Sequence, residues 1–241
     1  MPKHKKYSIT VFFPCYNDAK SIKKLVQDSF LILKKISRDF EVIVVDDGST
    51  DQSRQILEKL SKKYSKLKVI LHKKNLGYGG ALKTGFKSAT KELVFYTDGD
   101  GQYDVKELPI LLSLLSDDVD FINGIKMSRH DPSYRIFAGN LYSFVARWLF
   151  FLITYDVDCD FRLIKRSILK KLDLKSNSGS ICVELVKKSQ RAGAKFRQVS
   201  VHHLERRWGQ SQFFRLDRIL TTFSELGSLW IELMILDKLK K

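Results

Sequence analysis

The 241-residue sequence contains few of the residues that mark unusual chain classes, with 3 cysteines, 4 prolines and 13 glycines. Cys15, Cys159 and Cys182 lie far apart and form no C-x-x-C pair, which argues against a disulfide framework and against a cysteine-based zinc site. The low proline and glycine content excludes collagen-like and low-complexity segments. Cysteine usage of this kind is typical of a reducing compartment.

Long apolar runs are also missing. The two longest, residues 144–155 and 226–236, are interrupted by Arg147 and Glu232, and both are shorter than the about 20 residues that a membrane-spanning helix needs. The basic first residues lead directly into a strand-like segment without the apolar core of a signal peptide. We therefore expect no transmembrane segment and a cytoplasmic protein.

Acidic residues are outnumbered by basic ones. The chain has 43 Lys and Arg against 27 Asp and Glu, which gives a formal net charge of +16. Such a surplus favours nucleic acid, acidic lipid surfaces or phosphorylated small molecules as partners, and charge alone does not separate these classes. A hydrophobic content of 44% with 29% charged residues indicates a globular chain whose length suits one α/β domain.

Short apolar segments alternate with helical patterns in the first half of the chain. The apolar segments are typical of strands buried on both faces: residues 7–13, 40–45, 67–71 and 92–97. Helical periodicity occupies the gaps between them: residues 22–36, 56–64 and 78–89. This order predicts an α/β fold with a mostly parallel central sheet flanked by helices, in which ligands bind beyond the C-terminal ends of the strands.

The second half is less regular but shows no linker and no repeat. Residues 119–124 and 196–201 are expected strands, and the expected helices are residues 105–115, 135–151 and 180–191. We predict one domain over residues 1–212 and a C-terminal amphipathic helix over residues 213–241. The apolar stripe and basic ends of that helix fit a membrane interface. A core-facing helix or the seam of a homodimer is the alternative.

Two of the predicted strands end in acidic loops. Asp46 and Asp47 follow the second strand, and Asp98 and Asp100 follow the fourth, separated by one glycine. Carboxylates at alternate positions of an extended turn can approach one point, and Mg²⁺ or Mn²⁺ often takes one or two carboxylates plus substrate phosphates. A solvated turn rich in Asp and Gly is the alternative. The position directly after an apolar strand favours a cation site.

Three other ligand motifs are incomplete. An EF-hand over the second acidic loop would need Gly and Glu where Tyr103 and Pro109 stand. The glycine-rich segment 75–85 fails the dinucleotide fingerprint at Leu82 and the P-loop pattern at Phe86. What remains is a glycine-rich turn into a helix, which allows close backbone approach to phosphate or sugar.

Four segments resemble, in chain order, the motifs of family 2 glycosyltransferases with the GT-A fold: FPCYND at 13–18, VDDGSTD at 45–51, NLGYGG at 75–80 and DGDGQ at 98–102. Two later segments are similar to the dolichyl- or polyprenyl-phosphate sugar transferase branch: DVDCDFRL at 156–163 and RWGQS at 207–211. The resemblance covers about residues 7–215, and we expect no counterpart of the transmembrane helices that some relatives have. It implies an inverting transfer of a hexose from a nucleotide-diphosphate sugar, of the GDP-mannose or UDP-glucose type, to a polyprenyl phosphate, with Mg²⁺ or Mn²⁺ as cofactor.

The resemblance also implies site residues by position. Those that would bind the donor are Pro14, Tyr16, Asn17, Asp18, Asp46, Asp47, Gly77, Gly79, Lys83, Asp98 and Gly99. Those that would hold the metal ion are Asp98, Asp100 and Gln102. Those expected to contact the acceptor phosphate are Lys126, Arg135, Arg162, Arg207 and Ser211; the resemblance implies Arg135, Arg207 and Ser211 by position, whereas Arg162 is included for its charge. Those that would carry catalysis are Asp98, Asp100, Arg135, Asp156 and Arg207.

The chain departs from the family pattern at three positions. Lys126 stands where an arginine is frequent, so a point charge replaces a bidentate phosphate clamp. Asp160 stands where many members have Gly, and Gln212 stands where a Lys is common. The last departure removes one expected phosphate contact.

The nature of the acceptor stays open on chemical grounds. A phosphate acceptor is already anionic near neutral pH, whereas a hydroxyl acceptor needs a carboxylate as general base. The candidates for that base are Asp156, Asp158, Asp160 and Glu184. Because basic residues crowd the second half of the chain, we favour a phosphate acceptor, which the resemblance implies is a polyprenyl phosphate. The C-terminal helix then suggests a peripheral position on the cytosolic face of a membrane. A hydroxyl acceptor in cell-surface glycan assembly is the alternative.

A nucleic-acid-binding protein is the hypothesis from a different class. The net charge supports it, but the acidic strand ends would repel phosphate unless a metal ion is bound, and no RNA- or DNA-binding motif is present. We therefore expect no nucleic-acid partner.

Overall fold

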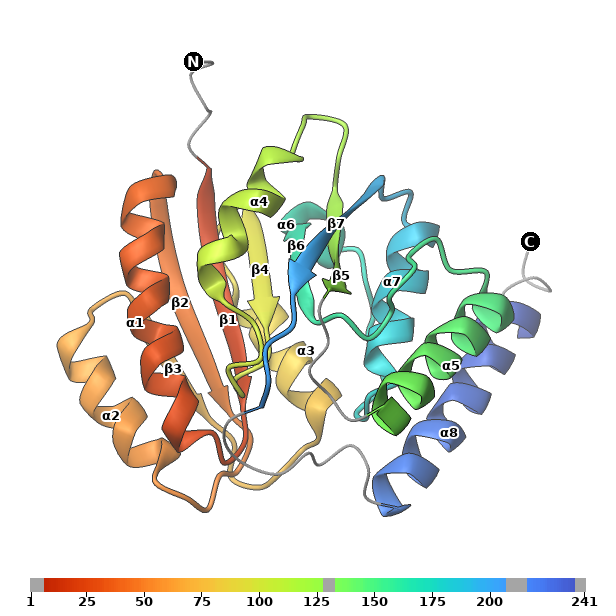
Figure 1. Ribbon diagram of the computed structural model, residues 1–241, viewed down its shortest axis with the longest axis horizontal. Coiled ribbons are helices and arrows are strands. Elements are labelled where there is room, and N and C mark those ends of the chain that lie inside the picture. Colours follow the sequence, from red (N-terminus) through yellow and green to blue (C-terminus); the bar gives the residue numbers. More distant parts are fainter. Residues whose placement is uncertain (1–6, 128–132, 207–215, 237–241) are drawn as a thin grey trace.

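The computed structural model describes residues 7–127, 133–206 and 216–236 of the chain (Figure 1). Within these residues, seven strands form one sheet in the order β3-β2-β1-β4-β6-β5-β7. The strands are β1 (Ser8–Cys15), β2 (Asp39–Asp46), β3 (Leu67–Leu71), β4 (Leu93–Thr97), β5 (Phe121–Met127), β6 (Phe161–Lys165) and β7 (Phe196–His202). The predicted α/β class is confirmed.

Helices flank the sheet on both faces. They are α1 (Ala19–Ile36), α2 (Ser53–Lys63), α3 (Tyr78–Ser88), η1 (Val105–Glu107), α4 (Leu108–Ser113), α5 (Ser133–Phe150), α6 (Arg166–Leu169), α7 (Ile181–Arg191), α8 (Leu216–Trp230) and the π-helical turn η2 (Ile231–Leu236). Helices α1, α2 and α4 cover one face, while α3, α5, α6, α7 and α8 supply the buried side chains of the other face. This two-sided cover is what a parallel sheet requires.

Strand pairing is parallel except around β6. β1 pairs in parallel with β2 and β4, β2 pairs with β3, and β5 pairs with β7. β6 runs antiparallel to both of its neighbours, β4 and β5. The mostly parallel sheet is therefore confirmed, and the ends of β1, β2 and β4 lie at one edge as expected.

The observed elements follow the apolar periodicity closely in the first half. The strand predicted at residues 67–71 has the same bounds in the structure, and β1, β2 and β4 begin or end within two residues of their prediction. The helix predicted at residues 105–115 consists of η1 and α4 and ends at Ser113. No strand was predicted for β6, whose five residues include a fully buried arginine.

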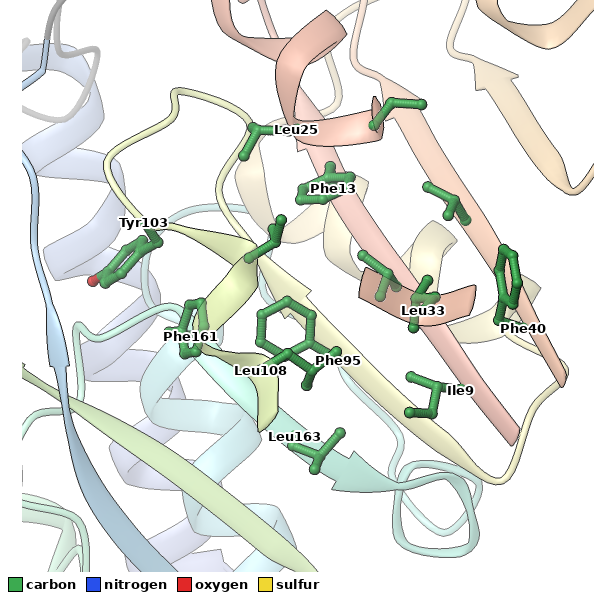
Figure 2. Close-up of a cluster of buried hydrophobic side chains, with 14 of the residues drawn as sticks. Ile9, Phe13, Leu25, Leu33, Phe40, Phe95, Tyr103, Leu108, Phe161 and Leu163 are labelled. Carbon is green, nitrogen blue, oxygen red and sulfur yellow. The ribbon is translucent and has the colours of Figure 1, made fainter. Parts of the chain in front are cut away.

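Alternation along the strands divides the core into two clusters. On β1, Val11 and Phe13 belong to the cluster beneath α1 and α4 (Figure 2), whereas Phe12 belongs to the cluster beneath α3 and α7. Successive side chains of a strand point to opposite faces, so one apolar run serves both clusters. Phe95 and Phe161 pack edge to face at 4.7 Å between ring centroids, which joins β4 to β6. Burial of one such side chain stabilises the fold by about 1.5–3 kcal/mol.

Helices α5 and α8 lie side by side (Figure 1), and Trp230 Nε1 donates a hydrogen bond to the Leu149 carbonyl at 3.1 Å. By length and composition alone, the helical stretch Asp217–Leu236 could cross a membrane. Counting uninterrupted apolar runs did not predict this, because Glu225 and Glu232 divide the stretch. Leu229 and Leu233 are nevertheless buried in the core.

Candidate active site

A cavity of about 910 Å³ lies where β1, β2 and β4 end. Pro14 and Cys15 come from the end of β1, Asp47 follows β2, and Asp98 follows β4. Helices α3, α5 and α8 close its other sides through residues such as Tyr78, Tyr142 and Arg218. The volume falls within the about 300–1,000 Å³ typical of ligand sites.

Most of the residues expected at a donor site line this cavity. They are Pro14, Tyr16, Asn17, Asp18, Asp47, Gly77, Asp98 and Gly99, and the predicted metal ligands Asp100 and Gln102 line it as well. The structure thus brings together residues from four loops that lie up to 88 positions apart, between Pro14 and Gln102.

The acidic pair after β4 is held in place by hydrogen bonds. Asp98 Oδ1 accepts a hydrogen bond from the Tyr78 hydroxyl at 2.7 Å, and Asp100 Oδ1 accepts one from the Gln102 backbone N–H at 2.9 Å. Burial of the Asp98 carboxyl raises its pKa well above the usual range, and the charges of Asp160 and Asp100 raise it further. A carboxylate pair under such repulsion is stabilised by any cation that binds it.

Arg206 is a cation that contacts Asp100 of this pair in the structure. Its guanidinium donates to Asp100 Oδ2 and, through Nε, to Gln102 Oε1 at 3.2 Å. Gln102 in turn donates from Nε2 to the Leu204 carbonyl at 3.2 Å. The segment after β7 therefore lies directly against the acidic turn.

The donor set fits a magnesium or manganese ion bound together with substrate. Among the described residues, no group of three or more His, Cys, Asp or Glu side chains is arranged to hold a metal ion by itself. Mg²⁺ usually takes only one or two carboxylates and completes its coordination with phosphate oxygens and water. Asp98 and Asp100 supply such a pair at the wall of a cavity large enough for a nucleotide.

Asp47 anchors the glycine-rich loop that closes one end of the cavity. Its carboxylate accepts hydrogen bonds from the backbone N–H groups of Leu76 at 2.8 Å and Gly77 at 3.0 Å. His72 Nδ1 lies 2.7 Å from Asp47 Oδ1 on the other side. The loop and the strand end are thus fixed relative to each other.

Gly77 and Gly79 let the backbone of this loop pack against residues 176–177. At Gly77 the φ angle is +84°, and a Cβ atom would lie 2.4 Å from the Asn177 carbonyl oxygen. A Cβ atom at Gly79 would lie 2.4 Å from the Ser176 carbonyl oxygen. Only glycine fits both positions without movement of the backbone.

Asn17 ties the loop after β1 to the loop after β2. Its φ angle is +59°, a region that asparagine tolerates better than most residues. Its side-chain Oδ1 accepts hydrogen bonds from the backbone N–H groups of Thr50 at 2.8 Å and Asp51 at 3.2 Å. These contacts place Tyr16 and Asp18, the neighbours of Asn17, at the cavity wall.

Asp18 lies between the acidic turn and the loop after β1. Its Oδ2 accepts a hydrogen bond from the Tyr16 backbone N–H at 3.0 Å. Burial raises the pKa of Asp18 to about 7, and the charge of Asp100 contributes to the increase. Gly99 allows this proximity, because a Cβ atom there would lie 2.5 Å from the Pro14 carbonyl oxygen and 3.0 Å from Asp18 Oδ2.

Three of the residues predicted to bind the donor do not line the cavity. Asp46 is fully buried, and its Oδ1 accepts hydrogen bonds from Arg54 Nε at 2.8 Å and from Ser49 N–H at 3.1 Å. Lys83 donates to the carbonyl of Lys175 at 2.7 Å and to Asn177 Oδ1 at 2.8 Å. Asp46, Lys83 and Gly79 therefore shape the walls without facing the cavity.

Arg162 is not placed to contact an acceptor phosphate. It is fully buried, and its guanidinium donates to the Tyr96 hydroxyl at 2.6 Å, to Asn123 Oδ1 at 2.8 Å and to the Val157 carbonyl. The prediction rested on charge, whereas a buried arginine is stabilised by partners that satisfy its five N–H donors. Arg162 joins β4, β5 and β6 beneath the site.

The remaining predicted acceptor residues are only partly described. Lys126 lines the cavity, and its Nζ lies 3.6 Å from Asp156 Oδ1. Arg135 lies in the first turn of α5, but its side chain is outside the described part of the chain. Arg207 and Ser211 also lie outside the described residues, as does Gln212.

The carboxylates considered as general bases differ in their access to the cavity. Asp156 is buried and accepts a hydrogen bond from the Lys126 backbone N–H at 3.1 Å. Glu184 is buried and accepts hydrogen bonds from two backbone N–H groups and from Lys188. Asp158 and Asp160 line the cavity. Burial raises the pKa of Asp158 to about 6, against the opposing charge of Lys126.

Among the cavity residues that the sequence interpretation missed are two arginines, Arg206 and Arg218. Arg206 was passed over in favour of its neighbour Arg207, and the structure shows that Arg206 reaches the acidic turn. Arg218 of α8 lies 5.9 Å from the ring centroid of Tyr16. It had been assigned to the basic end of a membrane-facing helix, and no local pattern distinguishes it from a surface residue.

Comparison with known proteins identifies the class to which this fold and cavity belong. Residues 10–173 match the family described as Glycosyl transferase family 2, so the chain belongs to this family. The family expected from the ordered motifs is thereby confirmed.

Among known sequences, the chain is similar to undecaprenyl-phosphate 4-deoxy-4-formamido-L-arabinose transferases. It is 25% identical over 208 residues to the protein of Enterobacter sp. (strain 638) and 27% identical over 207 residues to that of Pectobacterium atrosepticum. These alignments cover 86% of this chain, which spans 63% and 62% of the length of the two relatives.

Among solved structures, the chain is similar to glucosyl-3-phosphoglycerate synthase from Mycobacterium tuberculosis. The complex of that enzyme with Mn²⁺, uridine diphosphate and glucosyl-3-phosphoglycerate superposes with a TM-score of 0.72 at 16% identity, covering 95% of this chain and 81% of that one. The complex with Mn²⁺ and UDP-glucose gives a TM-score of 0.70. The similarity confirms the GT-A fold.

Proposed function

We propose that this protein is an inverting, divalent-cation-dependent glycosyltransferase that transfers a hexose from a nucleotide-diphosphate sugar to a polyprenyl phosphate at a membrane surface. The observation that carries the proposal is the single cavity in which Asp98 and Asp100 meet the loops after β1 and β2. Family membership and the names of the relatives support the same reaction class.

The loops at the ends of β1 and β2 form the donor nucleoside pocket in this proposal. Tyr16 supplies a ring, Asp47 supplies a fixed carboxylate, and the backbone from Asn75 to Gly77 closes the pocket. The wall is polar and pre-organised, because its side chains are already hydrogen-bonded to one another. Such a pocket loses little entropy when a nucleoside binds.

The diphosphate of the donor lies beside the acidic turn in this proposal. Asp98, Asp100 and the amide oxygen of Gln102 would hold Mg²⁺ or Mn²⁺, which when bound neutralises the charge of the departing diphosphate. The chain as a whole carries a net charge of +16, yet this part of the cavity is acidic. A doubly anionic diphosphate is therefore repelled by the empty turn and attracted once a cation is present.

Of the described residues that line the cavity, Arg206 and Lys126 are two that supply positive charge. Arg206 already contacts Asp100 and Gln102, so a phosphate oxygen bound there would lie within reach of its guanidinium. Lys126 lines the cavity and suits an acceptor phosphate as a point charge. An acceptor phosphate needs no general base, because its oxygen is anionic near neutral pH.

Helices α5 and α8 carry an exposed apolar surface that suits a membrane. We call this surface the aromatic face; its exposed members are Tyr134, Phe137, Leu141, Phe144, Trp148, Phe151, Leu220, Phe223 and Ile231. Soluble monomers rarely expose an apolar area of this extent. The cavity is lined by α5 and α8 as well, at Gly139 and Thr221 among others. A lipid held at the aromatic face could thus extend its phosphate into the cavity.

The contacts of α8 support a position on the membrane surface. Glu225 accepts a hydrogen bond from the Ser178 hydroxyl at 2.7 Å, and Glu232 forms an ion pair with Lys175 at 2.8 Å. These contacts and the buried Leu229 attach the helix to the sheet domain along its length. A helix bound in this way lies in the interface plane. We place the enzyme on the cytosolic face.

Activity measurements with purified protein test the proposal. We expect transfer from UDP-glucose or GDP-mannose to polyprenyl phosphate only with Mg²⁺ or Mn²⁺, and loss of activity with a chelator. Asp98→Asn and Asp100→Asn should each lower kcat by about 10²-fold or more, because stabilisation of the leaving diphosphate is lost. Asp117→Asn, at an exposed loop position, is the matched control. Wild-type turnover in both cavity variants would refute the proposal.

A second acceptor class is favoured by one observation, the position of Asp158. This carboxylate lines the cavity, and its pKa of about 6 suits a general base for a hydroxyl acceptor. Transfer to a hydroxyl should then increase as the pH rises through about 6, because only the ionised carboxylate accepts the proton. Transfer to a phosphate should show no such dependence on Asp158, and Asp158→Asn distinguishes the two acceptors.

A further inference from the structure

We propose that Asp160 and Asp158 form the wall that faces the transferred sugar, and that this wall selects a sugar rich in hydroxyl groups and rejects one that carries a carboxylate. The inference rests on the proposed function, since it concerns the donor of the same reaction. It adds the residues that would select a neutral sugar over one that carries a carboxylate.

The location of Asp160 follows from its neighbours. Tyr78 donates a hydrogen bond to Asp98 at 2.7 Å. Asp160 lines the same cavity as Tyr78 and Asp98. In a nucleotide sugar, the sugar is bonded directly to the diphosphate. A diphosphate at Asp98 therefore brings the sugar next to Asp160.

Asp160 is held in one orientation by three side chains beneath the cavity. Its Oδ1 accepts hydrogen bonds from the Tyr96 hydroxyl at 3.2 Å and from Cys182 Sγ at 3.3 Å. Arg162 lies 3.7 Å away and is itself fixed by Tyr96 and Asn123. The carboxylate cannot turn away from a ligand without breaking this network, and it retains acceptor positions toward the cavity.

Asp158 adds a second carboxylate to the same wall. It lines the cavity two residues before Asp160, and among the described residues it has no hydrogen-bond or ion-pair partner. Its oxygens are therefore available to a ligand. The nearby cation, Lys126, lies 3.6 Å from Asp156 and already has an acidic partner.

The chemistry of the wall determines which sugar it takes. Two carboxylates offer only acceptors, and sugar hydroxyl groups are donors that form charge-assisted hydrogen bonds with them. A uronic acid sugar would bring a third carboxylate against the first two, and like charges at this distance repel. The pair thus discriminates by attraction to one class and repulsion of the other.

Paired donor sugars that differ only in the carboxylate test this inference. We would measure the Kd of UDP-glucose and UDP-glucuronate in the presence of Mn²⁺ by calorimetry, and repeat the pair with GDP-mannose and GDP-mannuronate. Whichever of the UDP- and GDP-sugars the protein binds, the uronate should bind about tenfold more weakly than the hexose in the wild-type protein. Asp160→Asn, which removes the charge and keeps the size, should reduce this ratio by improving uronate binding.

Further variants and controls separate a change in sugar discrimination from misfolding of the protein. Asp158→Asn is the second variant, because its side chain is outside the buried network and its removal should leave the fold intact. Asp117→Asn should leave the ratio unchanged, and unaltered affinity for UDP or GDP with Mn²⁺ shows that each variant keeps the nucleoside pocket. Equal binding of hexose and uronate by the wild type, or an unchanged ratio in both cavity variants, would overturn the inference alone. Absence of binding by every nucleotide and nucleotide sugar would overturn the proposed function with it.

Discussion

Burial of the Asp18 carboxyl makes the stability of the protein depend on pH. The pKa of Asp18 is raised from 3.8 to about 7, chiefly by burial. The unfolded chain releases this proton near pH 4, so between pH 4 and pH 7 the folded state binds more protons than the unfolded state. The free energy of unfolding therefore decreases as the pH rises through this window, and the ionised Asp18 destabilises the protein above it.

Asp18→Asn should remove this pH dependence. An amide retains the acceptor for the Tyr16 N–H and carries no charge, so the variant should gain stability over the wild type by up to about 4 kcal/mol at pH 8 and by little at pH 4. Urea denaturation of both proteins between these pH values measures the difference. A constant difference across the range would show that Asp18 does not titrate in this window.

Arg162 and Lys126 were both predicted to contact the acceptor phosphate, but Arg162 is buried beneath the site and Lys126 lines the cavity. The sequence alone does not distinguish a structural basic residue from one that binds a ligand. Replacement by Lys should lower the free energy of unfolding by about 3–5 kcal/mol, because the buried partners of the guanidinium lose their hydrogen bonds. Chemical denaturation measures this loss. For Lys126→Gln, at the cavity wall, we expect a raised KM for the acceptor with little change in stability. If Arg162→Lys instead raised the acceptor KM at unchanged stability, the structural role would be wrong.

At the scale of elements, the strands and helices of the first half follow from the sequence because their apolar runs and periodicity are regular. β6 does not follow, since Arg162 interrupts its apolar pattern and its antiparallel direction depends on strands far away in the chain. The strand-end motifs predict the donor side of the cavity well. They do not tell Asp46 from Asp47, because only the orientation of the strand end shows which carboxylate faces the cavity.

The glycine loop before α3 has a packing requirement that one substitution tests. Gly77→Ala places a Cβ atom 2.4 Å from the Asn177 carbonyl oxygen at a φ angle of +84°. Gly193 has a similar φ angle of +81° but no atom within 4 Å of its Cβ position, so Gly193→Ala measures the backbone strain alone.

We expect Gly193→Ala to cost about 1 kcal/mol of stability. Gly77→Ala should cost more and should also weaken nucleotide binding, because the loop must move away from residues 176–177. Thermal denaturation and the Kd of UDP or GDP with Mn²⁺ provide the two measurements. Equal stability of the two variants, with wild-type nucleotide affinity, would mean that the loop adapts without cost.

At the scale of the whole molecule, exposed apolar residues are distributed unevenly over the surface. Helices α5 and α8 lie together on the side of the sheet opposite α1 and α2 (Figure 1), and the aromatic face on them contains Phe137, Phe144 and Trp148 at 70%, 65% and 71% exposure. Leu31 on α1 is 61% exposed but lies away from this face. Helices α5 and α8 thus carry the exposed apolar surface and also line the cavity.

Substitution of the aromatic face should detach the enzyme from membranes without disturbing its chemistry. We expect the wild type to sediment with vesicles that contain anionic phospholipid, and Phe144→Ser combined with Trp148→Ser to weaken binding about tenfold or more, because two large apolar side chains no longer enter the interface. Leu31→Ser is the matched control and should bind as the wild type does. The double variant should keep its turnover with a short, water-soluble prenyl phosphate and lose turnover with a long-chain acceptor in vesicles. If it instead bound vesicles normally while an otherwise dimeric protein became monomeric, the aromatic face would be a contact between two copies of the chain.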